Sequence, residues 1–419
     1  MNILHTSDWH IGRTLYGRKR YEECAAFLDW LAETIEREAI DVLLVAGDIF
    51  DSSMPSNRSQ ELYYRFLCRA AASCRHVVVV AGNHDSPSFL SAPKELLKAL
   101  GVHVVGSACA DPQDEVLVLK NRQGAPELIV CAVPYLRDRD IRAATAGESI
   151  EDKERKLLDG IRDHYAAVAA LAEQKRRDID SGGADMPADI VADIPIVGMG
   201  HLFVLGGQSM EGDGVRDLTI GSLAQVSAGI FPACFDYLAL GHLHAPQKVD
   251  GSETMRYSGS PLPMSFGEAK RQKSVCRVAF NGTAASVRLI EVPVFQELER
   301  LQGDWAGIAE RIAALATAGA PTWLEVVYDD TDIIGDLRER LDAAVFGTRL
   351  EILQVKNSRI AERILQQSQA GEALEDLDEN AVFERCLLAH EVPEDQRPEL
   401  RRSYQETLAS LYDDDSRAE

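Results

Sequence analysis

The chain has 419 residues, of which 46% are hydrophobic and 26% are charged; this balance is typical of a folded globular protein, and the length predicts two or three domains. Lys and Arg number 44 against 67 Asp and Glu, a formal net charge of −23, which argues against a free-standing nucleic-acid-binding protein because such proteins present a basic surface to phosphate. No apolar run reaches the roughly 18 residues of a membrane span, and the eight scattered cysteines form no CxxC pair, which predicts reduced thiols in a cytosolic protein.

The first 290 residues alternate short apolar runs with segments of helical period. The opening sequence, MNILHTSDWHIG, has no basic stretch followed by an apolar one, so we expect no secretory signal. Length and β-branching predict strands at Ile3–Thr6, Val42–Ala46, Val77–Ala81, Val102–Val105, Leu128–Val133, Ile196–Met199 and Tyr237–Leu240. Helices are predicted at Tyr21–Ala39, Arg58–Ala72 and Lys94–Leu100. This alternation predicts a layered α/β domain over residues 1–290.

Two later parts of this domain have a different character. Residues 140–194 contain a long charged helical stretch, Glu151–Arg177, and then an acidic, loop-like sequence. We interpret residues 140–194 as an excursion on the surface rather than part of the core. Further on, strand patterns at Arg256–Gly259, Val275–Phe280 and Ser286–Val292 predict an antiparallel portion.

A break near Pro293 introduces a second domain. Helix, strand, helix and strand patterns follow one another at Trp305–Ala318, Trp323–Tyr328, Ile333–Phe346 and Leu350–Val355, which predicts a small α/β capping domain over residues 291–357. Residues 358–419 are polar and acidic, yet they carry two amphipathic patterns built on Val382, Phe383, Cys386 and Leu387 and on Leu400, Tyr404, Leu408 and Leu411. We interpret this part as a linker and a helical tail that docks a partner; the alternative is that these helices pack back on their own chain.

Five short clusters combine possible metal ligands with glycine. They are Asp8-Trp9-His10, Gly47-Asp48, Gly82-Asn83-His84-Asp85, Gly200-His201 and Gly241-His242-Leu243-His244. Each follows a predicted strand, and loops at the carboxyl edge of an α/β sheet converge on bound ligands. Imidazole, carboxylate and amide ligands suit manganese, iron or zinc better than calcium. Their number predicts two metals that share a bridging carboxylate, an arrangement suited to phosphoryl chemistry.

The order DxH, GD, GNHD, GH and GHxH resembles the calcineurin-like metallophosphoesterase family. The longer strings NILHTSDWHIG, DVLLVAGDIFDSSMPS, VVVVAGNHDSP, FDYLALGHLHAPQ and RYSGSPLPMSFGE resemble more closely its SbcD group, the nuclease subunits of bacterial SbcC–SbcD DNA repair complexes. The resemblance covers residues 1–290 strongly and residues 291–357 by arrangement only. It implies a layered β-sandwich core flanked by helices, with a small α/β cap domain and a C-terminal helical tail.

The resemblance also implies a role for each cluster residue. One divalent ion, manganese in this family, would be held by Asp8, His10, Asp48 and His244. The other would be held by Asp48, Asn83, His201 and His242, so that Asp48 bridges the two. His84 is expected to act as a general acid, or as a cation that stabilises the leaving oxygen, and Asp85 is expected to orient its ring.

The activity implied by the resemblance is that of a metal-dependent DNA nuclease. It would be a 3′–5′ double-strand exonuclease and a hairpin or single-strand endonuclease, acting with a coiled-coil ATPase of the SbcC type in double-strand-break and hairpin processing, replication and recombination. A partner that holds the DNA would fit the acidic composition. A cytoplasmic, nucleoid-associated location is expected. A homodimer within a heterotetramer is also implied, formed through helices that carry Leu62, Phe66, Leu96, Leu97 and Leu100; the alternative is that these residues are plain core.

Two other functions are compatible with the same cluster residues. A phosphodiesterase or phosphatase acting on a small molecule or a protein would use the same site, although it would not need the cap domain or the tail. A non-catalytic scaffold could keep the metal for structure, although it would have no use for His84.

Basic residues near the clusters are candidates for DNA contacts. Arg13, Arg18, Lys19 and Arg20 form a basic island after the first cluster, and Arg58 follows the second. They either contact the phosphate backbone or belong to a solvated loop and helix start. Trp9 is expected to pack in the core, and residues 257–261 are expected to shape the floor of the site.

Overall fold

The computed structural model describes residues 1–142, 148–181, 194–204, 226–330 and 334–357, together with Phe383, Glu384, Leu387, Arg397, Arg401 and Tyr404. The chain divides into two compact units, Met1–Glu299 and Arg300–Glu419. The division predicted after residue 290 falls shortly before this one. Among the described residues, none of the helices has the length and apolar character needed to cross a lipid bilayer.

The first sheet of unit one has the strand order β14-β13-β1-β4-β5-β6. Its strands are β1 (Asn2–Thr6), β4 (Val42–Ala46), β5 (His76–Val80), β6 (Val102–Val105), β13 (Ser274–Asn281) and β14 (Ala284–Glu291). Strands β1, β4, β5 and β6 run parallel, whereas β13 is antiparallel to both β1 and β14. Strand β4 and residues Val77–Val80 of β5 are continuous runs of buried apolar residues because both faces of the sheet are covered.

The second sheet has the strand order β11-β12-β10-β9-β8-β7. Its strands are β7 (Val116–Lys120), β8 (Pro126–Ala132), β9 (Ile196–His201), β10 (Tyr237–Gly241), β11 (Gln247–Lys248) and β12 (Met255–Tyr257). Strands β8, β9, β10 and β12 are parallel. Each sheet therefore aligns the carboxyl ends of its parallel strands along one edge.

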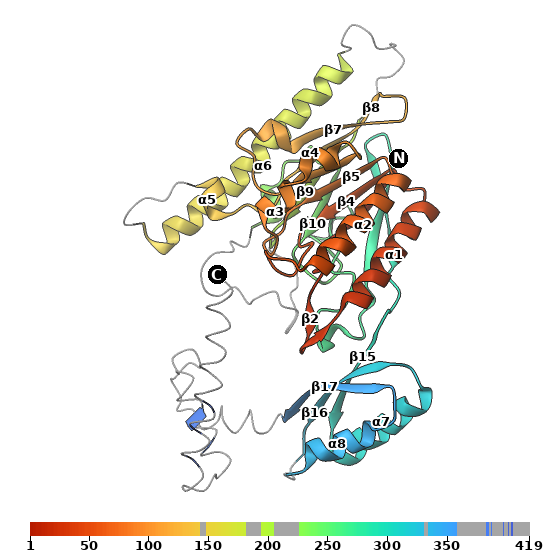
Figure 1. Cartoon of the computed structure of the whole chain (residues 1–419). Helices are drawn as coiled ribbons and strands as arrows, with labels where there is room; N and C mark the ends of the chain where they lie inside the picture. Colours follow the sequence, from red (N-terminus) through yellow and green to blue (C-terminus); the bar gives the residue numbers. More distant parts are fainter. Residues whose placement is uncertain are drawn as a thin grey trace. The chain divides into compact units, whose positions relative to one another are not determined.

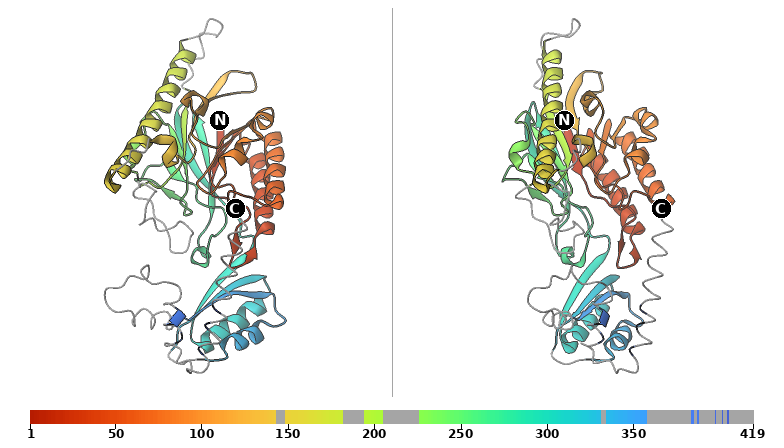
Figure 2. Two further views of the ribbon diagram at one scale, coloured as in Figure 1. Left: turned by 60° about the vertical axis from the view of Figure 1, so that its left-hand side comes forward. Right: turned by 90° about the vertical axis from the view of Figure 1, so that its left-hand side faces the viewer.

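The two sheets pack face to face between layers of helices (Figure 2). Residues of both sheets, such as Leu44 and Val80 from the first and Val130 and Met199 from the second, form the core between them. Helices α1 (Tyr21–Arg37) and α2 (Asn57–Ser73) cover the outer face of the first sheet (Figure 1). Helix α6 (Ile150–Asp180) covers the outer face of the second. This arrangement confirms the predicted helix-flanked β-sandwich.

Helix α6 corrects the expectation that residues 140–194 lie outside the core. The helix itself agrees with the predicted stretch Glu151–Arg177, but Leu157, Ile161, Tyr165 and Val168 are buried against the second sheet. They recur at spacings of three and four and so form one apolar stripe among charged residues. The high overall charge concealed this stripe. The acidic sequence that follows, residues 182–193, lies outside the described residues.

Several short elements complete unit one. They are the hairpin strands β2 (Thr14–Leu15) and β3 (Arg18–Lys19), the helices α3 (Pro87–Ser91), α4 (Lys94–Lys98) and α5 (Asp138–Ile141), and the 3-10 turns η1 (Pro112–Glu115), η2 (Ala228–Ile230) and η3 (Phe266–Glu268). On α2 and α4, Leu62, Phe66 and Leu97 are buried, whereas Leu96 and the following Leu100 are exposed.

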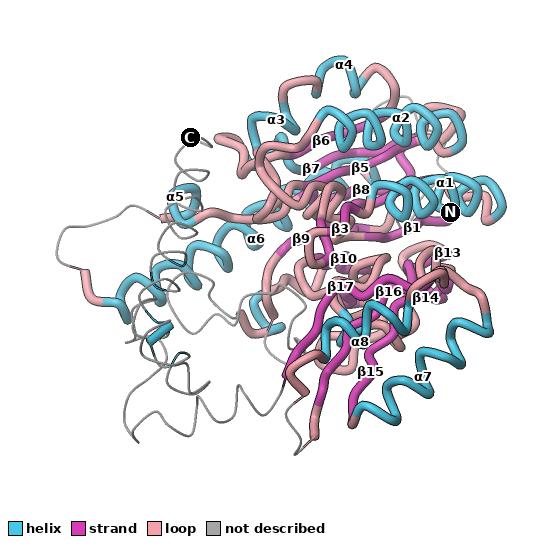
Figure 3. Tube along the Cα trace, turned by 60° about the horizontal axis from the view of Figure 1, so that its bottom comes forward, coloured by secondary structure: helices cyan, strands magenta, loops and turns pink. Residues whose placement is uncertain are grey.

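The C-terminal sheet has the order β15-β16-β17. Its elements are β15 (Glu297–Gly303), α7 (Trp305–Ala318), β16 (Thr322–Tyr328), α8 (Leu337–Val345) and β17 (Leu350–Asn357). Both helices pack against this small sheet (Figure 3), where Ile308, Ile312 and Leu341 meet Leu324 and Val326. The predicted small α/β arrangement is confirmed, and β15 is an additional strand that the sequence reasoning missed.

Most of the predicted tail lies outside the described residues, including Val382, Cys386, Leu400, Leu408 and Leu411. Where residues are described, the two predicted segments meet. The rings of Phe383 and Tyr404 stack with centroids 4.0 Å apart, and Glu384 forms an ion pair with Arg401.

Candidate metal centre

All five clusters come together at the carboxyl ends of the central strands of both sheets. Asp8 and His10 follow β1, Asp48 follows β4, Asn83 and His84 follow β5, His201 ends β9, and His242 and His244 follow β10. The sequence reasoning placed these clusters at a sheet edge. The structure shows that the edge belongs to two sheets, so each sheet supplies part of one constellation.

The backbone around these residues is constrained in ways that explain the neighbouring glycines. Positive φ angles, which L residues rarely adopt, occur at Asp8 (54°), His10 (44°), Asp48 (51°) and His242 (104°). A Cβ atom on Gly82 would lie 2.1 Å from Asp48 Oδ1, and one on Gly47 would lie 2.3 Å from His201 Nδ1. Only glycine lets these loops approach the ligand candidates so closely.

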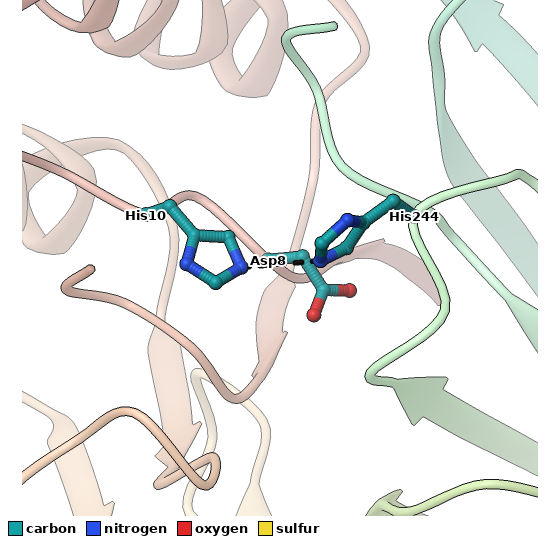
Figure 4. Close-up of side chains that lie close together, drawn as sticks. All are labelled: Asp8, His10 and His244. Carbon is teal, nitrogen blue, oxygen red and sulfur yellow. Dashed lines mark hydrogen bonds between the residues drawn. The ribbon is translucent and has the colours of Figure 1, made fainter. Parts of the chain in front are cut away.

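Asp8, His10 and His244 form the first group (Figure 4). His10 and His244 reach toward one another from separate loops beside Asp8, and their Nε2 atoms are 3.2 Å apart. The Asp8 carboxylate also accepts hydrogen bonds from the backbone N–H of His242, at 3.0 and 3.2 Å, and from the Ser7 hydroxyl. One possible ligand atom from each of the three residues lies within 4.8 Å of those of the other two, and all three residues are buried.

Asp48, His201 and His242 form the second group, with Asn83 between the two rings. Asn83 Oδ1 lies 3.0 Å from His201 Nε2 and 3.1 Å from His242 Nδ1. His201 Nδ1 donates to the Ala46 carbonyl at 2.9 Å. Because that carbonyl can only accept, the proton of a neutral His201 ring sits on Nδ1, and Nε2 is left as a possible metal ligand.

Asp48 lies between the two groups. Its Oδ2 atom is 3.3 Å from His201 Nε2 and 3.6 Å from His10 Nε2, and its Oδ1 atom accepts the backbone N–H of His84 at 2.9 Å. Burial raises the pKa of Asp48, but the neighbouring histidines outweigh burial and hold that pKa well below its usual range. This central placement suits the bridging role that the family resemblance implied for Asp48.

The chemistry of this donor set fits divalent cations. Acceptor atoms of several buried side chains crowd within hydrogen-bond distance of one another, and buried carboxylates need a compensating positive charge. Burial lowers the pKa of His201, yet Asp48 raises it to about 9. Burial raises the pKa of Asp8 to about 6. In the metal-free protein, bound protons therefore neutralise part of the negative charge of the carboxylates, which metal ions would otherwise neutralise.

His84 stands at the edge of the constellation and is half-buried. Its Nδ1 donates to the Asp51 carbonyl at 2.9 Å, and its ring meets that of His10 edge-on with centroids 4.9 Å apart. This contact fixes the orientation of the ring. The ring is also close enough to His10 and Asp48 to group with them as a possible ligand.

Asp85 does not make the contact that the sequence reasoning gave it. Its carboxylate accepts the backbone N–H groups of Gly82, Ile49 and Phe50 at 2.8, 3.1 and 3.0 Å. Asp85 therefore fastens the loop after β5 to the loop after β4, and the Asp51 carbonyl orients the ring of His84. Although Asp85 follows His84 in the sequence, its carboxylate points away from the His84 ring.

Three residues near the site were missed by the sequence reasoning. Asp51 Oδ1 lies 3.2 Å from His10 Nδ1 and 3.3 Å from Arg13 Nη1. Tyr135, after β8, meets the ring of His201 edge-on at 6.3 Å. Arg137 lies over the ring of Tyr135 and donates to the Asp85 carbonyl at 3.0 Å. The sequence PYLRDR follows the predicted strand Leu128–Val133, as each of the five clusters follows a strand, and this signal could have identified both Tyr135 and Arg137.

The basic candidates for DNA contacts occupy different environments. Arg20 is only 2% exposed and forms an ion pair with Glu23 at 2.6 Å and a hydrogen bond to the Pro263 carbonyl at 2.6 Å. This burial removes Arg20 from the candidates, as a correction to the prediction. Arg18 and Lys19 form the exposed strand β3. Arg58 forms an exposed ion pair with Glu22 and lies over the ring of Tyr21.

Trp9 lies among core aromatics, as expected. It is buried, its rings meet Phe27 and Phe66 edge-on, and its Nε1 donates to Thr6 Oγ1 at 3.0 Å.

Comparison with known proteins gives a consistent picture. Residues 1–246 match the family model described as calcineurin-like phosphoesterase, and residues 294–391 match the one described as type 5 capsule protein repressor C-terminal domain. The chain is 37% identical over 414 residues to the SbcD subunit of nuclease SbcCD from Escherichia coli K12, covering 98% of each chain. The chain is also 37% identical to the protein of the same name from Rhodobacter capsulatus, with 77% of this chain and 76% of the relative covered. It is 36% identical to the one from Bacillus subtilis, with 66% of this chain and 65% of the relative covered.

Proposed function

This chain belongs to the calcineurin-like phosphoesterase family and, within it, to the SbcD nuclease subunits, and from this premise we propose that it is a metal-dependent hydrolase of DNA phosphodiester bonds. One observation carries the proposal: Asp48 lies between two buried ligand groups, 3.3 Å from His201 Nε2 and 3.6 Å from His10 Nε2, and the ring of His84 groups with His10 and Asp48. A scaffold that only stored a metal would not need an ordered imidazole beside it.

The proposed ligand assignment follows the two groups. Asp8, His10, Asp48 and His244 hold one divalent ion, and Asp48, Asn83, His201 and His242 hold the other; the preferred ion is Mn²⁺. Ions bound there supply Lewis acidity and lower the pKa of a coordinated water. The interlocked loops of the chain fix the ligand positions before substrate arrives, so that little reorganisation is needed during the reaction.

His84 acts as the general acid for the leaving group. The oxygen of the attacking water forms a bond to phosphorus and gives up one proton to solvent, while the bond from phosphorus to the sugar oxygen breaks. His84 Nδ1 is committed to the Asp51 carbonyl, so Nε2 of the imidazolium is the atom that gives its proton to the departing sugar oxygen. Arg137 donates to the carbonyl of Asp85, the residue after His84, and Tyr135 contacts the ring of His201.

Further parts of the proposal concern substrate and partners. We propose 3′–5′ exonuclease action on duplex ends and endonuclease action on hairpins and single strands, together with an ATPase of the SbcC type, in a heterotetramer that contains two copies of this chain. The relatives are named as one component of an SbcCD nuclease, and this name supports the partnership. The exposed Arg18, Lys19 and Arg58 and the partly exposed Arg13 remain the proposed DNA contacts, and the proposed location is the cytoplasm, at the nucleoid.

The proposed domains are a nuclease domain at residues 1–290, a cap at 291–357 and a docking tail at 358–419. The family match at residues 294–391 supports treating the C-terminal part as a separate module. The exposed Leu96 and Leu100 support a contact between copies near α4.

Cleavage of end-labelled DNA tests the activity. Linear duplex and hairpin substrates are incubated with Mn²⁺, alone and with the ATPase partner and ATP, and a small phosphodiester is assayed in parallel. His84→Ser is expected to lower kcat by about 10²–10⁴, whereas His76→Ser, a histidine on the far end of β5, leaves it unchanged. Hydrolysis of the small ester with DNA intact under every condition would instead indicate a small-molecule phosphodiesterase.

A further inference from the structure

Lys273 and Glu268 form a buried ion pair that contacts the backbone of the first ligand group. The reaction proposed above does not use this pair. Lys273 is 4% exposed and Glu268 is 1% exposed. The Lys273 ammonium donates to Glu268 Oε2 at 2.6 Å, to Ser260 Oγ at 2.9 Å and to the backbone carbonyl of His244 at 3.1 Å. These three bonds match the three N–H donors of a lysine. Burying such a pair costs desolvation free energy that apolar side chains avoid, so a specific role is expected.

The ammonium sits where the two sheets meet. Lys273 directly precedes β13, which pairs with β1 in the first sheet, and β1 leads into Asp8 and His10. His244 follows β10 in the second sheet. Lys273 therefore connects the sheet that carries two members of the first ligand group to the loop that carries the third.

The His244 carbonyl is held from a second direction as well. The backbone N–H of Ser260 donates to it at 3.1 Å. Gly259 has a φ of 74°, and a Cβ there would lie 2.8 Å from the same carbonyl oxygen. Glu268 Oε2 also accepts the backbone N–H of Met264 at 2.9 Å. Lys273 and Glu268 thus hold the segment around 259–268 tightly against the backbone of His244.

We propose that Lys273 is a positioning residue that fixes His244 relative to Asp8 and His10, and that it thereby sets the affinity of this metal position selectively. The inference rests on the proposed metal centre. The second ligand group is held by other contacts, between His201 and the Ala46 carbonyl and between Asn83 and the two rings. A loss of Lys273 should therefore weaken one position and leave the other intact.

The test uses the full chain and separates positioning from folding. Lys273→Met alone leaves the Glu268 carboxylate buried without its cation, which is strongly destabilising. The double variant Lys273→Met with Glu268→Gln removes that charge and keeps an acceptor for Met264. Mn²⁺ binding to the metal-free proteins is measured by calorimetry, after circular dichroism has confirmed a cooperative fold. Arg75→Met is the matched control, because Arg75 forms ion pairs with Asp41 and Glu127 away from the site.

The expected result is a loss of tenfold or more in affinity at one of two Mn²⁺ positions in the double variant, with the other position within twofold of the unsubstituted protein. Hydrolysis of a small phosphodiester should then require about tenfold more Mn²⁺ and recover its kcat at saturation. Arg75→Met should keep both affinities. Unchanged affinities in a folded double variant would overturn only the proposed role of Lys273. Absence of Mn²⁺ binding by the unsubstituted protein would overturn the proposed metal centre itself.

Discussion

Replacing Asp85 separates its observed contacts from the orienting role expected from sequence. In Asp85→Ala, the N–H groups of Gly82, Ile49 and Phe50 lose their buried acceptor. Each unsatisfied N–H costs about 1–3 kcal/mol, and partial relaxation of the loops brings the expected loss in the free energy of unfolding to about 4 kcal/mol. Asp85→Asn keeps one oxygen, which can still accept from Gly82 and Ile49, and is expected to lose about 2 kcal/mol.

Urea denaturation of the metal-free protein, followed by circular dichroism, measures both losses. Asp29→Asn is the control: Asp29 is exposed and pairs with Arg69 on the surface, so its loss should stay below about 1 kcal/mol. If Asp85 acted mainly by orienting His84, kcat would fall while the free energy of unfolding stayed within about 1 kcal/mol of the unsubstituted protein. That outcome would refute the loop-fastening role.

The remaining predictions address the glycine positions, the core, acid stability and metal removal. Gly82→Ala places a Cβ 2.1 Å from Asp48 Oδ1 and should weaken Mn²⁺ binding tenfold or more in calorimetry; normal binding would contradict the steric argument. Trp9→Ala removes a buried ring packed on Phe27 and Phe66 and should cost about 3–5 kcal/mol in urea denaturation, whereas a loss below 1 kcal/mol would place Trp9 outside the core. Burial lowers the pKa of His5 to about 3 from 6.5, so the stability that its neutral ring contributes is fully present above pH 6.5 and decreases as the pH falls toward 3. Between pH 7 and pH 5 this amounts to about 2 kcal/mol, and metal-free His5→Gln should show that much less acid destabilisation. Chelation of Mn²⁺ held at 100 times its Kd should lower the free energy of unfolding by about 2.7 kcal/mol per site, and equal thermal stability with and without EDTA would argue that no ion is bound.

The predicted strands agree closely with the structure because their burial dominates their sequence. Val42–Ala46 coincides with β4, a continuous apolar run that is buried throughout because both faces of the sheet are covered. Val102–Val105 coincides with β6, an edge strand whose three valines carry the β-branched signal. Strand β15 escaped prediction because its sequence, ELERLQG, is largely polar, with Leu298 and Leu301 as its buried residues. Helix α6 was placed outside the core because its apolar stripe is narrow and its other faces are charged.

The clusters of the site could be predicted because chain order and strand ends were sufficient to bring them together. The partners of individual side chains could not. Asp85 turns to amides of the loop after β4, and no property of the GNHD string reveals that loop's position. Arg20 is buried because Glu23 lies one helical turn away and the Pro263 carbonyl arrives from a distant part of the chain. Local sequence shows a basic island, whereas the tertiary structure decides which of its members meet solvent.

Each ligand group draws on both sheets, and this links metal binding to the packing of the fold. The first group takes Asp8 and His10 from the first sheet and His244 from the second, and the second group takes Asp48 and Asn83 from the first and His201 and His242 from the second. The apolar core between the sheets brings the two edges together, but it also brings buried carboxylates and imidazoles into contact, which opposes folding in the absence of compensating charge. An ion at each group would offset that cost, and the Lys273 ammonium already donates to the backbone carbonyl of His244 in the first group. Metal binding and the packing of the sandwich therefore depend on the same part of the fold, because the proposed ligands lie where the edges of the two sheets come together.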